Sequence, residues 1–298
     1  MTAVFVGLAT VDLVQRVERL PGPNEKVAAL DAELLAGGPA AVAALTASVL
    51  GSESVLVTAL GRHPFAASAT AELHEHGVRV LDSADTGGVP PVSAVTVQSG
   101  TGERSVVSRS AAGRVSTPPD AFSEVVGGAD LVLLDGHYPE LALAAARLAS
   151  SAGVPVLLDG GSWKPVLTDL LPLVDVAVCS EDFRAPGTDT PESQGPALLD
   201  RGVDAVAVTR GAAPVLCWSL RGEPEELSVP PVDAVDTLGA GDVFHGAVAH
   251  AMCQSAWRER LPEVIDFAGR VASARVAHRG RTSWIDALHT SADLVFLG

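Results

Sequence analysis

Short apolar segments alternate with longer stretches of helical spacing along most of this 298-residue chain. The short segments have the length and composition of buried strands and cover residues 3–9, 54–60, 130–135, 155–159, 175–179 and 204–209. The longer stretches, at 39–50, 65–76, 140–151 and 194–201, repeat apolar residues every three or four positions. This alternation predicts an α/β fold in which a doubly wound, mostly parallel sheet carries helices on both faces.

Two segments, residues 12–35 and 93–109, interrupt this alternation. Each contains strand-like stretches of alternating polarity with no helical stretch between them, as a small β appendage would. One face of such an appendage needs a cover, which a substrate, the main domain or a second subunit can supply. We therefore predict one domain over residues 1–298 with a β lid, and this lid could also join two chains into a homodimer.

Composition narrows the class of protein. Apolar residues make up 47% of the chain and aromatic residues only 4%, so Ala, Val and Leu must form most of the core. No apolar run approaches the roughly 20 residues of a membrane span, and the N-terminus lacks the features of a secretory signal. The three cysteines are widely spaced in apolar surroundings, which suggests neither a metal site nor disulfides. We expect a protein of the reducing cytoplasm.

The formal net charge of −16 argues against nucleic acid and anionic membranes as partners, since no Lys/Arg cluster offsets it locally. Most of this acidity serves solubility. The eight histidines form no metal-binding pattern and no convincing Ser-His-Asp set, so we interpret them as ordinary residues. No Gly-x-Gly-x-x-Gly turn follows the first strand, which argues against an NAD-dependent oxidoreductase.

The most informative stretch is Asp-Thr-Leu-Gly-Ala-Gly-Asp at 236–242, which leads into an Ala- and Val-rich helix ending near residue 253. A Gly-Ala-Gly turn that feeds a helix exposes unpaired backbone amides at the positive end of the helix dipole. Glycines let a phosphate approach the backbone closely. Gly239, Ala240 and Gly241 are therefore predicted to form an anion hole for a transferring phosphoryl group.

Asp242 places a carboxylate beside this predicted anion hole. A carboxylate is out of place in a phosphate site unless it has another task, and accepting the proton of an attacking hydroxyl is such a task. An isolated Gly-Ala-Gly-Asp would be interpreted more simply as a capped helix. The longer string at 236–242 favours Asp242 as a catalytic base.

This string closely resembles the C-terminal signature of the ribokinase-like, phosphofructokinase-B-type carbohydrate kinases. Asp12 after the first strand and a Gly-Gly-helix segment at 37–51 extend the resemblance over nearly the whole chain. The resemblance implies a Rossmann-like core with a β lid, ATP as phosphate donor, Mg²⁺, and a stimulating monovalent cation such as K⁺. It also implies that Asp242 is the base and that residues 239–241 form the anion hole.

The resemblance extends to the substrate site. Asp12 follows the first strand, where ligands bind open α/β sheets, and by resemblance contacts substrate hydroxyls. Gly37 and Gly38 open a helix and let a ligand lie against the backbone. Val42 stands where the family has Asn, which removes a hydrogen bond to the sugar and leaves a less polar substrate open. Arg104 resembles an arginine directed towards the transferring phosphate, although a solvated arginine on an edge strand fits equally well.

Nucleotide and metal residues follow from the same resemblance. Thr209 and Gly211 resemble a nucleotide-binding Thr-x-Gly turn. Ser180 and Glu181 occupy the region where relatives organise Mg²⁺, its water and phosphate, although Phe183 stands where a Glu is expected. Asp236 would help to organise the cation-binding loop together with main-chain carbonyls near residues 275–283.

The sequence thus predicts an ATP-dependent kinase that phosphorylates a hydroxyl of a sugar or sugar-like molecule. A nucleoside kinase of the same fold is one alternative, because Val42 makes the predicted pocket less polar. A catalytically idle sensor that binds sugar or nucleotide is another, but such a protein has no need of the base Asp242.

Overall fold

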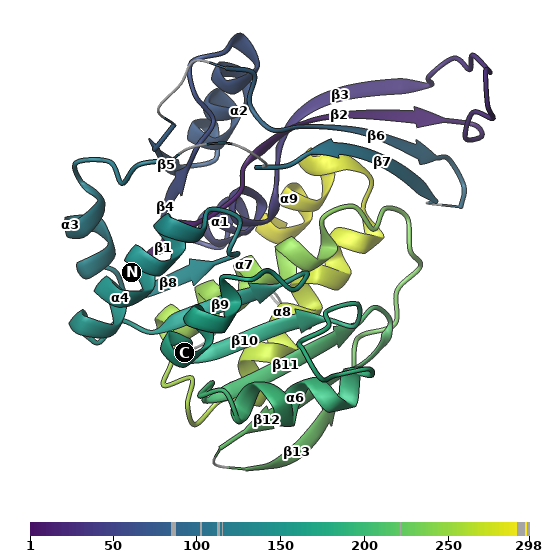
Figure 1. Cartoon of the computed structure of the whole chain (residues 1–298). Coiled ribbons are helices and arrows are strands. Elements are labelled where there is room, and N and C mark those ends of the chain that lie inside the picture. Colours follow the sequence, from purple (N-terminus) through teal and green to yellow (C-terminus); the bar gives the residue numbers. More distant parts are fainter. Residues whose placement is uncertain are drawn as a thin grey trace.

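The computed structural model describes residues 1–84, 88–101, 103–111, 114, 116–220, 222–290 and 296. Residue 102, within the segment 93–109 predicted to form part of the lid, lies outside the described residues. The strands form a nine-stranded main sheet, in the order β13-β12-β11-β10-β9-β8-β1-β4-β5, and a four-stranded small sheet, in the order β3-β2-β6-β7. Figure 1 shows the small sheet projecting from one side of the main body.

The main sheet is parallel over seven strands and ends in an antiparallel hairpin. The parallel strands are β1 (Thr2–Val6), β4 (Glu53–Thr58), β5 (Val78–Asp82), β8 (Leu131–Leu134), β9 (Val156–Gly160), β10 (Val176–Ser180) and β11 (Ala205–Arg210). The hairpin consists of β12 (Ala213–Ser219) and β13 (Gly222–Leu227). The six strands predicted from the sequence are confirmed to within three residues at each end. Sequence analysis missed β5 and the hairpin.

Helices cover both faces of the main sheet (Figure 1). One face packs against α1 (Pro39–Val49), α2 (Pro64–Glu75), α7 (Ala240–Gln254), α8 (Leu261–Ala277) and α9 (Gly280–Thr290). The other face packs against α3 (Phe122–Gly127), α4 (Pro139–Ala152), α5 (Leu167–Leu170) and α6 (Pro191–Leu199). Alternate residues of β1 enter the two cores, Phe5 on the first face and Val4 on the second, because successive side chains of a strand point in opposite directions. Within the described residues, no helix is long and apolar enough to cross a membrane.

The small sheet is built from the two segments that interrupt the alternation of strands and helices. It contains β2 (Thr10–Val17), β3 (Asp31–Gly37), β6 (Val92–Gln98) and β7 (Arg104–Arg109). β2 pairs parallel with β6, and β3 and β7 are antiparallel edge strands. Its two faces differ: Val14 and Val95 are buried on the inner face, whereas Leu13 and Leu34 are exposed on the outer face.

A close crossing of α1 and α7 fixes where α7 begins. A Cβ atom added at Gly246 of α7 would lie 2.4 Å from the carbonyl oxygen of Ala43 and 2.6 Å from Cβ of Thr46, both on α1. Only glycine permits this approach, because the obstructing carbonyl belongs to the backbone and cannot rotate away. The crossing holds the first turn of α7 beside the Gly37–Gly38 end of β3.

Replacing Gly246 by Ala should therefore separate the two helices and lower the free energy of unfolding by about 1–3 kcal/mol or more. Gly269 of α8 is a matched control, because a Cβ atom there meets no atom within 4 Å. Gly269→Ala should leave stability unchanged or raise it by about 0.5–1 kcal/mol. Urea unfolding of both variants measures the difference, and equal stabilities would contradict the proposed close packing.

Candidate active site

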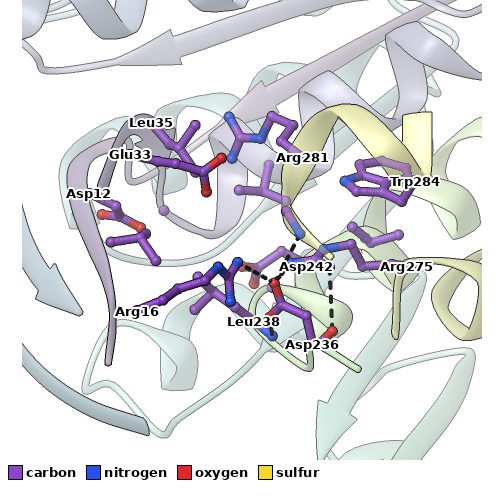
Figure 2. A pocket seen from close by; sticks show the side chains of 16 residues that line it. Asp12, Arg16, Glu33, Leu35, Asp236, Leu238, Asp242, Arg275, Arg281 and Trp284 are labelled. Atoms are coloured by element: carbon purple, nitrogen blue, oxygen red, sulfur yellow. Dashed lines mark hydrogen bonds and ion pairs between the residues drawn. The ribbon is translucent and has the colours of Figure 1, made fainter. Parts of the chain in front are cut away.

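A cavity lies between the inner face of the small sheet and the first turns of α7 and α9. Figure 2 shows side chains from four separate parts of the chain converging on it. The lining includes Asp12, Glu33, Gly38, Val42, Asp242 and Arg281. A concave site with apolar walls and a few convergent charges suits a small polar ligand.

The first turn of α7 faces this cavity and leaves amide groups free. Gly239 has φ 73° and precedes the helix. Among the described residues, none accepts a hydrogen bond from the amides of Gly239, Gly241 and Asp242. Ala240 differs from its predicted role, since its amide already donates to the carbonyl of Thr237 at 3.3 Å. The free donors are therefore those of Gly239, Gly241 and Asp242, and they can receive an anion at the positive end of the helix.

The Asp242 carboxylate lies at this helix start in a strongly negative environment. Burial raises the pKa of Asp242 to about 7, and the charge of Asp159 adds to this effect. Asp12 and Asp135 act in the same direction, whereas His245 opposes them. A carboxylate with a pKa near neutrality is a far better proton acceptor than an ordinary aspartate.

Asp12 lies three residues into β2, rather than in a turn after β1, and reaches the same cavity as Asp242. The Thr10 hydroxyl donates to Asp12 Oδ1 at 2.5 Å. Burial raises the pKa of Asp12, and the Thr10 hydroxyl opposes this shift. Gly37 makes room for the carboxylate, because a Cβ atom there would lie 2.0 Å from Asp12 Oδ2. Gly38 has φ +90°, and its added Cβ would lie 2.5 Å from the Leu8 carbonyl oxygen, so this position also requires glycine.

Asp236 is held between two arginines at the edge of the cavity (Figure 2). Its Oδ2 lies 2.8 Å from Arg16 of β2 and 3.2 Å from Arg275 of α8. The carboxylate also accepts the amides of Leu238 at 3.0 Å and Gly280 at 3.2 Å. Burial alone would raise the pKa of Asp236, but Arg275, these amides and Arg16 outweigh burial and lower it. These contacts organise the loop before α7, and a role of Asp236 in binding a cation there stays a prediction.

Arg104 makes a second connection between the small sheet and the loop before α7. It extends from the exposed strand β7, and its guanidinium donates to the Thr237 hydroxyl at 2.8 Å. Thr237 belongs to the 236–242 string, so the structure brings a cation to the motif that the sequence singled out. A contact between Arg104 and a transferring phosphate stays a prediction.

The remaining predicted residues lie at the carboxyl ends of β10 and β11, outside the described lining of the cavity. The Ser180 hydroxyl donates to a backbone carbonyl after β9 at 3.2 Å, and the Thr209 hydroxyl donates to a carbonyl of β10 at 3.3 Å. Gly211 has φ 60° in the turn between β11 and β12, and Glu181 is exposed. Ligands bind at this edge of open α/β sheets. The described residues contain no cluster of three or more His, Cys, Asp or Glu that could hold a metal by itself.

Sequence reasoning missed several residues of the site. His245, interpreted as an ordinary histidine, lies buried in the second turn of α7, and its Nε2 is 3.5 Å from Oδ1 of Asp159. Arg281 and Trp284 enter the cavity from α9, and Arg281 pairs with Glu72 of α2. These residues come from distant parts of the chain and belong to no local motif, so spacing offered no signal for them.

Comparison with known proteins bears on what this site does. A family model described as pfkB family carbohydrate kinase matches residues 2–287. The chain is 30% identical over 297 residues to a ribokinase of Arabidopsis thaliana, covering 93% of this chain and 76% of the relative. It is 26% identical over 277 residues to a deoxyribokinase of Salmonella typhi, covering 86% and 87%. The solved structure of Arabidopsis thaliana ribokinase complexed with ribose and ATP matches with a TM-score of 0.75 at 24% identity, over 98% of this chain and 99% of that one. These matches confirm the predicted resemblance and fold.

Replacing Asp236 by Asn should destabilise the protein by about 3–5 kcal/mol at pH 7, because two buried guanidinium groups lose their carboxylate. The folded-state pKa of Asp236 is lowered, so this stabilisation is present above the unfolded value of 3.8 and disappears as the pH falls through the folded value. The difference between wild type and variant should therefore narrow in acid. Urea unfolding of both proteins, from pH 7 down into the acid range, measures this difference in the free energy of unfolding.

Asp233→Asn serves as the control, since Asp233 is an exposed carboxylate in the same loop. It should change the free energy of unfolding by no more than about 0.5 kcal/mol. If the two variants were equally stable at pH 7, Asp236 would not hold the arginines as described.

Proposed function

Because this chain belongs to the pfkB family of carbohydrate kinases, which are phosphotransferases with a hydroxyl acceptor, we propose that it transfers the γ-phosphate of ATP to a hydroxyl of a sugar or sugar-like molecule. One observation carries the proposal: the amides of Gly239, Gly241 and Asp242 are free at the point where Asp242, with a pKa near 7, meets the cavity. A phosphate site and a proton acceptor thus coincide at one helix start.

In the proposed reaction, the acceptor hydroxyl lies in the cavity between Asp12 and Asp242. Asp12 accepts a hydrogen bond from the substrate and orients it. The acceptor oxygen bonds to the γ-phosphorus while the bond from that phosphorus to the β–γ bridging oxygen breaks, and ADP leaves. The hydroxyl proton passes to Asp242, and the free amides stabilise the negative oxygens of the phosphoryl group.

The nucleotide would lie along the carboxyl ends of β10 and β11, with Thr209, Gly211 and Ser180 against it. Support for this placement comes from α7 itself, because His245 in its second turn contacts the carbonyl of Val178 in β10 at 3.0 Å. The helix start therefore stands between the cavity and these strand ends. When bound, Mg²⁺ would neutralise charge on the phosphate oxygens, and Glu181 would hold it through water. K⁺ would occupy the loop that Asp236 organises, near the carbonyls of residues 275–283.

The small sheet would act as a lid over the acceptor. Its inner face supplies Asp12, Glu33 and Leu35 to the cavity, and Arg16 and Arg104 tie it to the loop before α7. Closure of such a lid excludes water, so that the phosphoryl group meets the acceptor rather than being hydrolysed.

Two classes of acceptor suit the cavity, a sugar and a nucleoside. Val42 is 9% exposed and lines the cavity together with Leu35 and Trp284, which would suit an apolar base, whereas Asp12 and Glu33 suit hydroxyl groups. A panel of sugars, sugar acids and nucleosides, with ATP consumption as the readout, separates the two. Tight binding without turnover across the whole panel would favour a catalytically idle sensor instead.

The proposed setting is a reducing cytoplasm, with a small molecule rather than nucleic acid or membrane as the partner. Cys179 and Cys217 are buried free thiols, and Cys253 is a half-buried one. Burial raises the pKa of Cys179 and Cys217, so neither thiol is activated for redox chemistry.

Asp242→Asn should lower turnover by roughly 10² to 10⁴ while folding and ATP binding persist, because only the proton acceptor is lost. In the wild type, kcat/KM should fall as the pH drops below about 7, since the raised pKa leaves Asp242 protonated there. Steady-state kinetics and calorimetric ATP titration measure these effects. Asp200→Asn, at the exposed end of α6, should behave like wild type. Near-normal turnover of the Asp242 variant would refute the assigned base.

We further propose that the outer face of the small sheet joins two copies of the chain. Register places Leu34 opposite Leu13, Leu13 opposite Ala94, and Ala94 opposite Val107. Leu13, Leu34 and Val107 are 38%, 43% and 75% exposed, so they form an apolar row across the sheet. A two-fold interface brings the same patch of both subunits together, and this row can cover its own copy.

Leu34→Glu combined with Val107→Glu should convert a dimer into a 30.4 kDa monomer, because it places charges in the apolar row. Light scattering at several concentrations measures the mass. Leu220→Glu, at a leucine 63% exposed near the β12–β13 turn, is the matched control and should remain dimeric. A wild-type protein that stays monomeric at high concentration would rule out the interface.

A further inference from the structure

His245 lies in the second turn of α7 with both ring nitrogens facing oxygen atoms. Nδ1 lies 2.7 Å from the carbonyl oxygen of Gly241, and Nε2 lies 3.0 Å from the carbonyl oxygen of Val178. The residue is only 6% exposed, and its contact with Val178 is buried. A backbone carbonyl can only accept a hydrogen bond, so each nitrogen must carry a proton.

Two protonated nitrogens make the ring an imidazolium. A neutral tautomer would direct a lone pair at one of the two carbonyl oxygens, which is repulsive. Asp159 supplies the counter-charge, since its Oδ1 lies 3.5 Å from Nε2 and its carboxylate is buried. No described residue bonds to Asp159 Oδ2. Burial lowers the pKa of His245, but Asp159, the carbonyl of Val178 and the charge of Asp242 outweigh burial and raise it.

Among the groups that shift the pKa of Asp242, His245 is the one that favours its ionised form. Asp242 precedes His245 by three residues, so the two side chains share a helix face. The other groups that act on Asp242 are all carboxylates: Asp12 of β2, Asp135 directly after β8, and Asp159 of β9. The remaining charged side chains around the cavity are Arg16, Glu33, Asp236, Arg275 and Arg281. Arg16 and Arg275 are bound to Asp236, and Arg281 is bound to Glu72.

We propose that His245 is a positioning residue that stays protonated: it bridges the carbonyls of Gly241 and Val178, pairs with Asp159, and favours the ionised form of Asp242. This inference rests on the proposed function for the role of Asp242 as base. The bridge also joins the free amides at the start of α7 to β10, where the nucleotide is placed. Neither His245 nor Asp159 needs to touch substrate for this role.

The charge of His245 can be tested without any assay of activity. In protein labelled with ¹⁵N-histidine, we expect one of the eight rings to retain two protonated nitrogens at pH 8, where ordinary histidines are neutral. This signal should be absent from His245→Asn. Eight neutral rings at pH 8 would overturn the proposal, whether or not the chain is a kinase.

The effect on Asp242 can be tested in the pH dependence of kcat/KM. His245→Asn should move the acid limb to higher pH by roughly one to two units, because Asp242 loses its neighbouring positive charge. Turnover should therefore fall about tenfold or more near pH 7 and recover at alkaline pH, while KM for ATP changes little. A loss of activity that is equal at every pH would show that His245 is merely structural and overturn the proposal.

His250→Asn is the matched control on the same helix. His250 is 3% exposed, and burial lowers its pKa to about 4. It is therefore neutral at pH 7 and has no electrostatic effect of a full charge on Asp242. The acid limb of the kcat/KM profile of His250→Asn should coincide with that of the wild type. An equal shift in both variants would overturn the proposal. If instead no substrate of the panel is phosphorylated while the ¹⁵N signal is present, the proposed function fails and the protonated His245 stands.

Discussion

The proposed chemistry depends on holding a carboxylate at the start of α7 among other carboxylates. Asp242 lies near Asp12, Asp135 and Asp159, and their mutual repulsion, together with burial, favours a proton on Asp242. Two features keep it within reach of ionisation, the positive end of α7 and the imidazolium of His245. In this environment the Asp242 carboxylate can take up a proton near neutral pH, which a solvated aspartate cannot.

Close backbone approach makes this arrangement possible. Gly246 lets α7 cross α1, Gly37 leaves space for the carboxylate of Asp12, and Gly38 adopts a positive φ beside β1. The Gly-Gly pair therefore serves packing as well as ligand access. Because Gly246 and Gly38 meet backbone carbonyls, the placement of α7 and of the Gly-Gly pair is set by the backbone itself and not by adjustable side chains.

In the proposed reaction, different parts of the site carry out phosphoryl transfer and recognition of the acceptor. The groups assigned to transfer lie at the start of α7 in the main body, whereas several residues assigned to the acceptor come from the small sheet. Arg16 and Arg104 connect the two parts through Asp236 and Thr237. Changes such as Val42 in place of Asn can alter which acceptor fits while the transfer groups stay in place. The same fold can thus serve ribokinases, deoxyribokinases and this chain.

The sequence by itself determined the alternation of strands and helices, the two segments of the small sheet, and the string at 236–242. These features are local, because each follows from periodicity or from glycines at a helix start. Tertiary structure alone decided that the Ala240 amide is engaged, that Asp236 binds arginines, and that both ring nitrogens of His245 face carbonyl oxygens. Such facts depend on which distant groups meet in the fold, and no local spacing records where those groups will lie.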